Sequence, residues 1–181
     1  MEISAMCVSN SGRMLASGQV GTIFQKNPEA PVILWDLPNK QPLAVLKGLS
    51  IAAKKLEFSP DDRFLAAVGE SNIIIIWDTT DGSAIYTRVF EVVPMFLSWG
   101  DILTDRNPKH PSYILVTGFQ NHVNINTLEY DIGSLQYFLK EGGCQMPNTG
   151  LIRNYTFSTV NGDMLMAGTT GGEICLFSIY S

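Results

Sequence analysis

Short runs of apolar and β-branched residues recur along this chain of 181 residues, and turn-forming residues separate them. Runs of four to eight such residues bounded by Gly, Pro, Asn, Asp or Ser predict β-strands. The run from Ile73 to Trp77 is the most apolar, and its length suits a buried strand. Helical periodicity appears nowhere over a useful length, so the pattern predicts an all-β fold.

The strand pattern repeats along the sequence. Ile33-Leu34-Trp35-Asp36 recurs as Ile75-Ile76-Trp77-Asp78, with 42 positions between the two tryptophans. This spacing is close to the roughly 40–45 residues of one β-propeller blade. The repeat predicts a partial β-propeller of about four blades, each of four antiparallel strands, with the last blade incomplete. The predicted blades span approximately residues 1–48, 49–90, 91–143 and 144–181.

The third and fourth blades carry the repeat less clearly, because neither contains a Trp-Asp pair. Asn126-Thr127 and Phe177-Ser178 fall near the place of that pair. The strands expected in these blades are Met95–Trp99, Ser112–Gly118, His122–Leu128, Leu135–Lys140, Arg153–Ser158, Met164–Gly168 and Glu173–Ser178. No fourth strand is expected in the last blade, which would leave an open edge.

Each residue that marks the repeat has a predicted structural role. Trp35 and Trp77 are expected to fill the gap between adjacent blades, since each buries a large area. Asp36 and Asp78 are expected to bind the backbone of the turn that follows them. Four glycines are expected to allow a sharp exit from the second strand of each blade: Gly18, Gly69, Gly118 and Gly168. The adjacent acids Asp61 and Asp62 are expected to be solvated turn residues.

Composition and charge exclude several classes of function. The chain is 45% hydrophobic and 16% charged, which suits a packed domain. Its formal net charge of -5 and the lack of a basic stripe argue against nucleic-acid binding. The longest apolar run is far shorter than a bilayer span, so we expect no membrane segment and a cytoplasmic protein. Three widely spaced cysteines, Cys7, Cys144 and Cys175, predict reduced thiols.

Motifs for chemistry are missing from the sequence. His110, His122 and Cys144 lack the spacing of metal ligands, so we predict no metal and no cofactor. The glycine-rich stretch Gly168–Gly172 is not followed by the helix of a phosphate-binding loop, and it predicts a hairpin turn. With no nucleophile, acid and base arranged together, we do not expect an enzyme.

The repeat residues resemble those of WD-repeat proteins. Leu56–Asp62, Phe64-Leu65-Ala66 and Ile75–Asp78 together are similar to a standard WD repeat. The resemblance implies a propeller that scaffolds protein complexes and is commonly seven-bladed. Many WD repeats place a Gly-His pair before the first strand, and its His joins a buried hydrogen-bond network. Here Gly48 is present and the His is not, so we expect more reliance on apolar packing.

Some stretches are similar to the cilia- and flagella-associated WD-repeat proteins: Ala16–Val20, Val32–Asp36 and Gly168–Ile174. This narrower resemblance implies a structural scaffold of the axoneme, a microtubule inner protein of ciliary or flagellar doublet microtubules. Its implied partners are tubulin and neighbouring axonemal proteins, within a larger chain or assembly. The alternative is a general WD-repeat adaptor, such as a ubiquitin-ligase substrate receptor or a signalling scaffold.

Two long connections are the predicted sites of partner contact, Gln19–Pro31 and Gly100–Pro111. Loops on a rigid scaffold commonly carry recognition, and these exceed the usual length of a hairpin loop. The candidate contact residues in them are Lys26, Asn27, Arg106, Lys109 and His110. Their local positive charge suits an acidic partner such as tubulin. The alternative is that both connections are merely mobile insertions.

Overall fold

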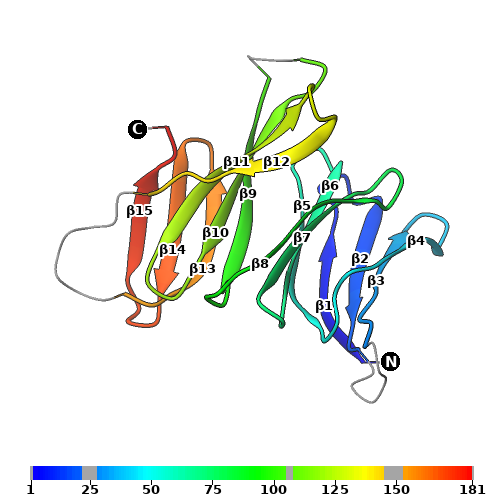
Figure 1. The fold of residues 1–181 in the computed structure, drawn as a ribbon. Helices are drawn as coiled ribbons and strands as arrows, with labels where there is room; N and C mark the ends of the chain where they lie inside the picture. The colour runs from blue at the N-terminus through cyan, green and yellow to red at the C-terminus, as the bar shows by residue number, and fades with distance from the viewer. Residues whose placement is uncertain (1, 22–27, 105–107, 145–152, 181) are drawn as a thin grey trace. The chain divides into compact units, whose positions relative to one another are not determined.

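The computed structural model describes residues 2–21, 28–104, 108–144 and 153–180, and within them every regular element is a β-strand. The chain divides into two compact units, Met1–Glu91 and Val92–Ser181. Every sheet is antiparallel, and its strands follow one another in chain order (Figure 1). The predicted all-β, partial-propeller fold is therefore confirmed.

The first unit contains two four-stranded sheets. Their strands are β1 (Ile3–Val8), β2 (Met14–Gln19), β3 (Val32–Asp36), β4 (Gln41–Leu46), β5 (Ala53–Phe58), β6 (Phe64–Gly69), β7 (Ile73–Asp78) and β8 (Ala84–Val89). The first strand of one sheet packs against the first strand of the next, β1 on β5. One hydrophobic cluster joins the two sheets, and the Cys7 and Leu34 side chains of the first sheet meet Leu56 and Trp77 of the second in it.

The second unit contains a four-stranded sheet and a three-stranded sheet. Their strands are β9 (Phe96–Leu103), β10 (Ser112–Gly118), β11 (Val123–Asp131), β12 (Gln136–Lys140), β13 (Tyr155–Asn161), β14 (Met164–Thr169) and β15 (Ile174–Ser178). The first strands again pack together, β9 on β13. Their shared cluster includes Phe96 and Val116 on one side and Leu165 and Phe177 on the other.

Several strands of the second unit are longer than the sequence predicted. β9 continues to Leu103 because Ser112 and Tyr113 of β10 pair with Leu103 and Ile102. Part of the predicted connection Gly100–Pro111 is therefore strand, which is a correction. β11 runs on to Asp131, whose carboxylate accepts hydrogen bonds from the backbone N–H groups of the turn that follows. Apolar pattern alone did not show these extensions, because Gly100 and Asp101 interrupt the apolar run in β9 and the charged Glu129 and Asp131 lie in the extension of β11.

The register places a tryptophan at the Trp35 position in the first two sheets and other residues there in the last two. Leu15 pairs with Trp35, and the equivalent pairs are Leu65 with Trp77, Leu165 with Phe177 and Leu115 with Asn126. Asn126 is buried, and its side-chain amide donates to Thr117 Oγ1 at 2.9 Å, just as Trp35 Nε1 donates to Ser17 Oγ at 2.8 Å. The third sheet thus keeps the hydrogen bond of this position without the indole.

Candidate interaction surfaces

The β5–β8 sheet shows what one face of a covered blade contains. Leu56, Ala67 and Ile75 are register partners on this face, as are Phe58, Leu65 and Trp77. All six are buried against the β1–β4 sheet, and Trp77 is 0% exposed. The Trp77 indole also donates to the backbone carbonyl of Lys47 at 2.9 Å. Trp77 therefore fills the gap between two sheets and satisfies its N–H there.

The equivalent face of the β1–β4 sheet is uncovered. Its register partners are Met6, Ser17, Ile33 and Val45 in one row and Val8, Leu15 and Trp35 in the next. Met6 is 61% exposed and Val8 56% exposed, and Trp35 is only half-buried. We call this surface, formed by Met6, Val8, Leu15, Ile33, Trp35 and Val45, the open face of the first sheet. Apolar residues on a sheet face are normally covered, so this surface is suited to binding a partner.

The last sheet has an open face as well. The strand register places four exposed apolar residues on the side of the sheet away from β9: Phe157, Met164, Ile174 and Leu176. Ile174 is 73% exposed and Leu176 60% exposed. The opposite side of the same sheet is packed, and there Ser158 and Ser98 share a buried hydrogen bond of 2.7 Å between hydroxyls. Each unit therefore presents one sheet face with exposed apolar side chains.

A carboxylate joins the two sheets of the first unit. Asp62 lies in the β5–β6 turn, and its two carboxylate oxygens accept the backbone N–H groups of Asn10 at 2.6 Å and Ser11 at 2.9 Å. Asn10 Nδ2 also donates to the carbonyl of Ser59 at 2.8 Å. Burial alone would raise the pKa of Asp62, but the hydrogen bonds from Ser11 and Asn10 outweigh it and hold the pKa below 3.8. Asp62 is not the solvated turn acid that the sequence predicted, because it is 9% exposed and bound to the neighbouring sheet.

The turns of the first two sheets hold equivalent arginines in different ways. In the second sheet, Asp78 Oδ1 accepts the backbone N–H of Thr80, and its Oδ2 lies 3.6 Å from Arg63 Nε. The Arg63 guanidinium also lies over the Phe64 ring, 5.0 Å from its centroid. Both groups therefore hold this arginine against the sheet surface.

In the first sheet the same arrangement is absent. Pro38 stands where Thr80 stands and has no N–H to donate. Asp36 instead accepts the backbone N–H of Asn39 on Oδ1 and the side-chain amide of Asn39 on Oδ2. Within the described residues, the Arg13 side chain has neither an ion pair nor a hydrogen bond.

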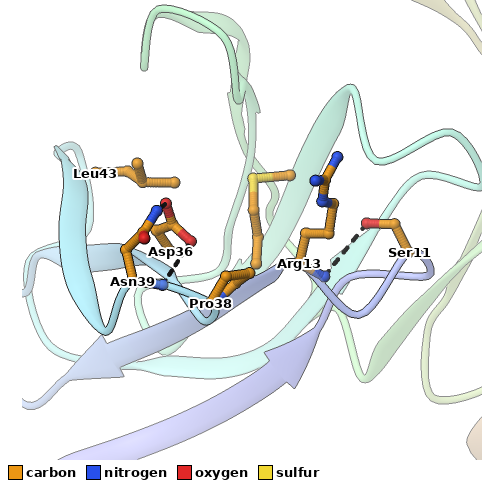
Figure 2. Close-up of a pocket in the computed structure, with 7 residues that line it drawn as sticks. Ser11, Arg13, Asp36, Pro38, Asn39 and Leu43 are labelled. Carbon is orange, nitrogen blue, oxygen red and sulfur yellow. Dashed lines mark hydrogen bonds between the residues drawn. The ribbon is translucent and has the colours of Figure 1, made fainter.

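A pocket of about 320 Å³ lies at these turns, lined by Ser11, Arg13, Met14, Asp36, Pro38, Asn39 and Leu43. Figure 2 shows Ser11 and Arg13 on one side of it and Asp36, Asn39 and Leu43 on the other. Its walls combine the Arg13 cation and the Asp36 carboxylate with the apolar groups of Met14, Pro38 and Leu43. Such a mixed lining is typical of small binding pockets.

Comparison with known proteins shows which proteins this chain is similar to. The chain is 27% identical over 175 residues to cilia- and flagella-associated protein 52 of Chlamydomonas reinhardtii, covering 96% of this chain and 26% of that protein. It is 34% identical over 85 residues to the human protein of the same name, covering 46% of this chain and 13% of that protein. It is 24% identical over 145 residues to Elongator complex protein 2 of Schizosaccharomyces pombe, covering 75% of this chain and 18% of that protein. The chain thus spans about a quarter or less of each relative, and no family model matches it.

A solved structure gives the fold independently. The β-propeller domain of Cps50 (Swd1) from Myceliophteria thermophila superposes with a TM-score of 0.70 at 19% sequence identity, over 97% of this chain and 51% of that chain. The described strands therefore match about half of a β-propeller domain. The chain has the fold of a partial β-propeller, and its repeat is similar to that of WD-repeat proteins.

Of the WD-repeat markers, the two aspartates bind the turns that follow them, through Asn39 and Thr80. The four glycines lie within the second strands, and none has a positive φ. At three of them space is the reason for glycine: a Cβ would lie 2.8 Å from Ala53 at Gly18, 2.6 Å from Ile73 at Gly69 and 2.0 Å from the Phe96 ring at Gly118. Gly168 has open space around it. The expectation of a sharp exit from the strand is therefore replaced by close packing.

The predicted contact residues of the WD-repeat loops are only partly described. Lys26, Asn27 and Arg106 lie outside the described residues. Lys109 is exposed, and His110 is half-buried with its ring stacked on Tyr130 at a centroid distance of 4.3 Å. Tyr130 in turn meets the edge of Tyr137 at 5.0 Å. His110 therefore belongs to an aromatic row that anchors the end of this connection to the β11–β12 hairpin.

Buried titratable groups in this chain are packed into the apolar clusters. Burial raises the pKa of Cys7 to about 12, and Glu57 adds to the rise. Burial also raises the pKa of Tyr155 to about 12, with Cys175 as the next cause. The three cysteines are free thiols. Among the described residues, no group of His, Cys, Asp or Glu could hold a metal ion, and no helix is long and apolar enough to cross a bilayer.

Sequence reasoning missed Asp62 and Arg13. Both lie in turns that repeat between the first two blades, and only the differences between those turns distinguish them. For Asp62 the signal was its alignment with Gly12 in the repeat. Both residues have a left-handed backbone, with φ +62° at Asp62 and +70° at Gly12, and a non-glycine residue is uncommon there. For Arg13 the signal was Pro38, which replaces the Thr80 donor of the next blade.

Proposed function

We propose that this chain is part of a structural scaffold that holds protein partners in cilia or flagella. The observation that carries the proposal is the similarity over 96% of the chain to a protein named as cilia- and flagella-associated. The geometry supports a binding role, because the surfaces described above are apolar faces and turns on a rigid sheet framework. Scaffolding needs such surfaces and no reactive centre.

We propose further that the scaffold is a microtubule inner protein of doublet microtubules. In this proposal its partners are tubulin and neighbouring axonemal proteins, and the protein belongs to the cytoskeleton of the axoneme. Support comes from the stretches Ala16–Val20, Val32–Asp36 and Gly168–Ile174, which are similar to that group of proteins. The cations Lys26, Arg106 and Lys109 would meet an acidic tubulin surface by charge complementarity.

Localisation in a ciliated cell tests the proposal. A tagged full-length protein is expected in the axoneme after detergent removes the membrane, and it should resist a high-salt wash. Absence from isolated axonemes would refute the ciliary function. Loss of the gene should remove density from the lumen of the doublet in tomograms, whereas an unchanged lumen would refute only the inner-protein role.

Charge reversal tests the loop contacts separately. The double variant Arg106→Glu and Lys109→Glu is expected to weaken axoneme binding and to change its salt dependence. Lys140→Glu is the matched control, since Lys140 is an exposed lysine on β12, outside both loops. Equal binding by the double variant and the control would exclude this loop as a contact.

A general adaptor is the second candidate. The similarity to Elongator complex protein 2 over 75% of the chain favours it, because that name describes a protein of a complex and makes no reference to cilia or flagella. Affinity purification that yields subunits of another assembly, such as a ubiquitin ligase, and no tubulin would support the adaptor. An enzyme is the third alternative, and turnover abolished by changing one polar residue would establish it.

A further inference from the structure

The pocket between the β1–β2 and β3–β4 turns is lined by an arginine, Arg13, that forms no ion pair with the described residues. By contrast, the equivalent Arg63 is paired with Asp78. Both oxygens of the nearest carboxylate in the pocket, Asp36, already accept hydrogen bonds from Asn39. The guanidinium therefore lies beside the pocket with its donors available, in a chain whose net charge is -5.

The apolar walls of the pocket favour a ligand with an aliphatic group. Met14, Pro38 and Leu43 give the pocket an aliphatic lining, and Leu43 projects from β4 as an exposed side chain. A volume of about 320 Å³ accommodates one or two side chains and is too small for a folded surface. A carboxylate matches the forked geometry of a guanidinium, and an aliphatic group beside it gains by leaving water.

We propose that this pocket binds a short acidic peptide segment of a partner protein. A Glu or Asp carboxylate accepts hydrogen bonds from Arg13, and the aliphatic side chain next to it packs on Met14, Pro38 and Leu43. The two turns are held by their own hydrogen bonds, so the site exists before the ligand arrives. The inference rests on the proposed scaffold function and specifies the chemistry of one partner segment.

The paired arginine of the second sheet provides an internal control. Arg13 and Arg63 occupy the same turn position, each two residues after an acceptor for turn N–H groups, Ser11 and Asp61. Only Arg13 faces a pocket with its donors available. Arg63→Gln should therefore leave peptide binding unchanged, while Arg13→Gln removes the charge that holds the carboxylate.

Direct binding by the full 181-residue chain tests the inference. The probe is a fluorescein-labelled peptide containing Glu-Leu-Glu between Gly-Ser spacers, compared with Gln-Leu-Gln and Glu-Ser-Glu versions by fluorescence polarisation. The Glu-Leu-Glu peptide is expected to bind best and to weaken as salt is added. Arg13→Gln should weaken it about two- to fivefold, the range for an ion pair at an exposed site. Leu43→Ser should erase the advantage over Glu-Ser-Glu.

Several outcomes would overturn the inference. These are equal binding of the Glu and Gln peptides, no loss of binding in Arg13→Gln, or an equal loss in Arg63→Gln. Competition by inorganic phosphate that abolishes all difference between peptides would show a general anion site instead. Urea denaturation of each variant confirms that it is folded. Absence of the protein from axonemes would leave these binding results unchanged, so the two proposals can fail separately.

Discussion

Trp35 and Trp77 occupy the same register position in successive sheets of the first unit, and their surroundings differ. Trp77 is buried under the β1–β4 sheet and donates to the backbone carbonyl of Lys47. Trp35 lies half-buried on an open face and donates to Ser17 of its own sheet. The same contrast separates Asp62, which binds the neighbouring sheet, from Gly12. A repeat residue therefore takes its energetic role from the sheet that packs on it, and the repeat motif alone does not set that role.

The largest difference in stability is expected between variants of the two tryptophans. Trp77→Ala is expected to lower the free energy of unfolding by about 3–5 kcal/mol, because it empties a fully packed site. Trp35→Ala should lower it by about 1–2 kcal/mol, the loss of one hydrogen bond and partial packing. Urea denaturation followed by strand circular dichroism measures both. Equal losses would mean that Trp35 is covered in solution.

Asp62→Asn tests the polar link between the two sheets. Asparagine tolerates the left-handed backbone at this position, so the substitution removes the charge with little backbone strain. One of the two backbone N–H groups, on Asn10 or Ser11, loses its acceptor, and the free energy of unfolding should fall by about 1–2 kcal/mol. The control is Asp81→Asn, which changes an acid in an exposed turn of the same sheet. A smaller loss for Asp62 than for Asp81 would contradict the link.

The pH dependence of that difference follows from the pKa of Asp62. The folded pKa lies below the ordinary value of 3.8, so folding favours the ionised carboxylate. Its stabilisation is fully present above the unfolded pKa and is lost as the pH falls through the folded pKa. The gap in urea midpoint between wild type and Asp62→Asn should therefore be constant near neutral pH and shrink at a pH below about 3.8. A gap that widens in acid would show that the carboxyl is protonated in the folded protein.

The smallest expected effect on stability is on the open face. Met6→Thr should change the free energy of unfolding by less than about 0.5 kcal/mol, because Met6 is already exposed and threonine suits a strand. The equivalent Leu56→Thr removes a packed side chain and should cost about 2–4 kcal/mol. Light scattering should also show less self-association for Met6→Thr than for wild type. Unchanged association would mean that this face does not mediate contact between copies.

The strands of the first two blades were predictable because their signals agree. The sequence predicts strands at Ile3–Val8, Val32–Asp36 and Gln41–Leu46, where apolar alternation and turn residues coincide, and β1, β3 and β4 have these bounds. The second unit was less predictable. Thr117 and Asn126 preserve a hydrogen bond that apolar pattern cannot show, and β9 and β11 extend past polar residues, Asp101 and Glu129, that interrupt the apolar run.

The candidate surfaces were harder to predict than the strands. Sequence reasoning did not identify Asp62 or Arg13, whose roles depend on which neighbour supplies or withholds a hydrogen bond. Asn39 donates hydrogen bonds to both oxygens of Asp36, whereas one oxygen of Asp78 pairs with Arg63. This difference leaves Arg13 without the ion pair that Arg63 has.

The sequential order of strands within every sheet has a kinetic consequence. Each strand pairs with the strand that precedes or follows it in the chain, so no sheet needs a strand from another part of the chain. Chain entropy is lost in smaller steps when pairing partners are near in sequence, and folding rates rise as contacting residues lie nearer in sequence. Within the first unit, the β1–β4 sheet can therefore form before the β5–β8 sheet, which then docks on a surface that is already ordered.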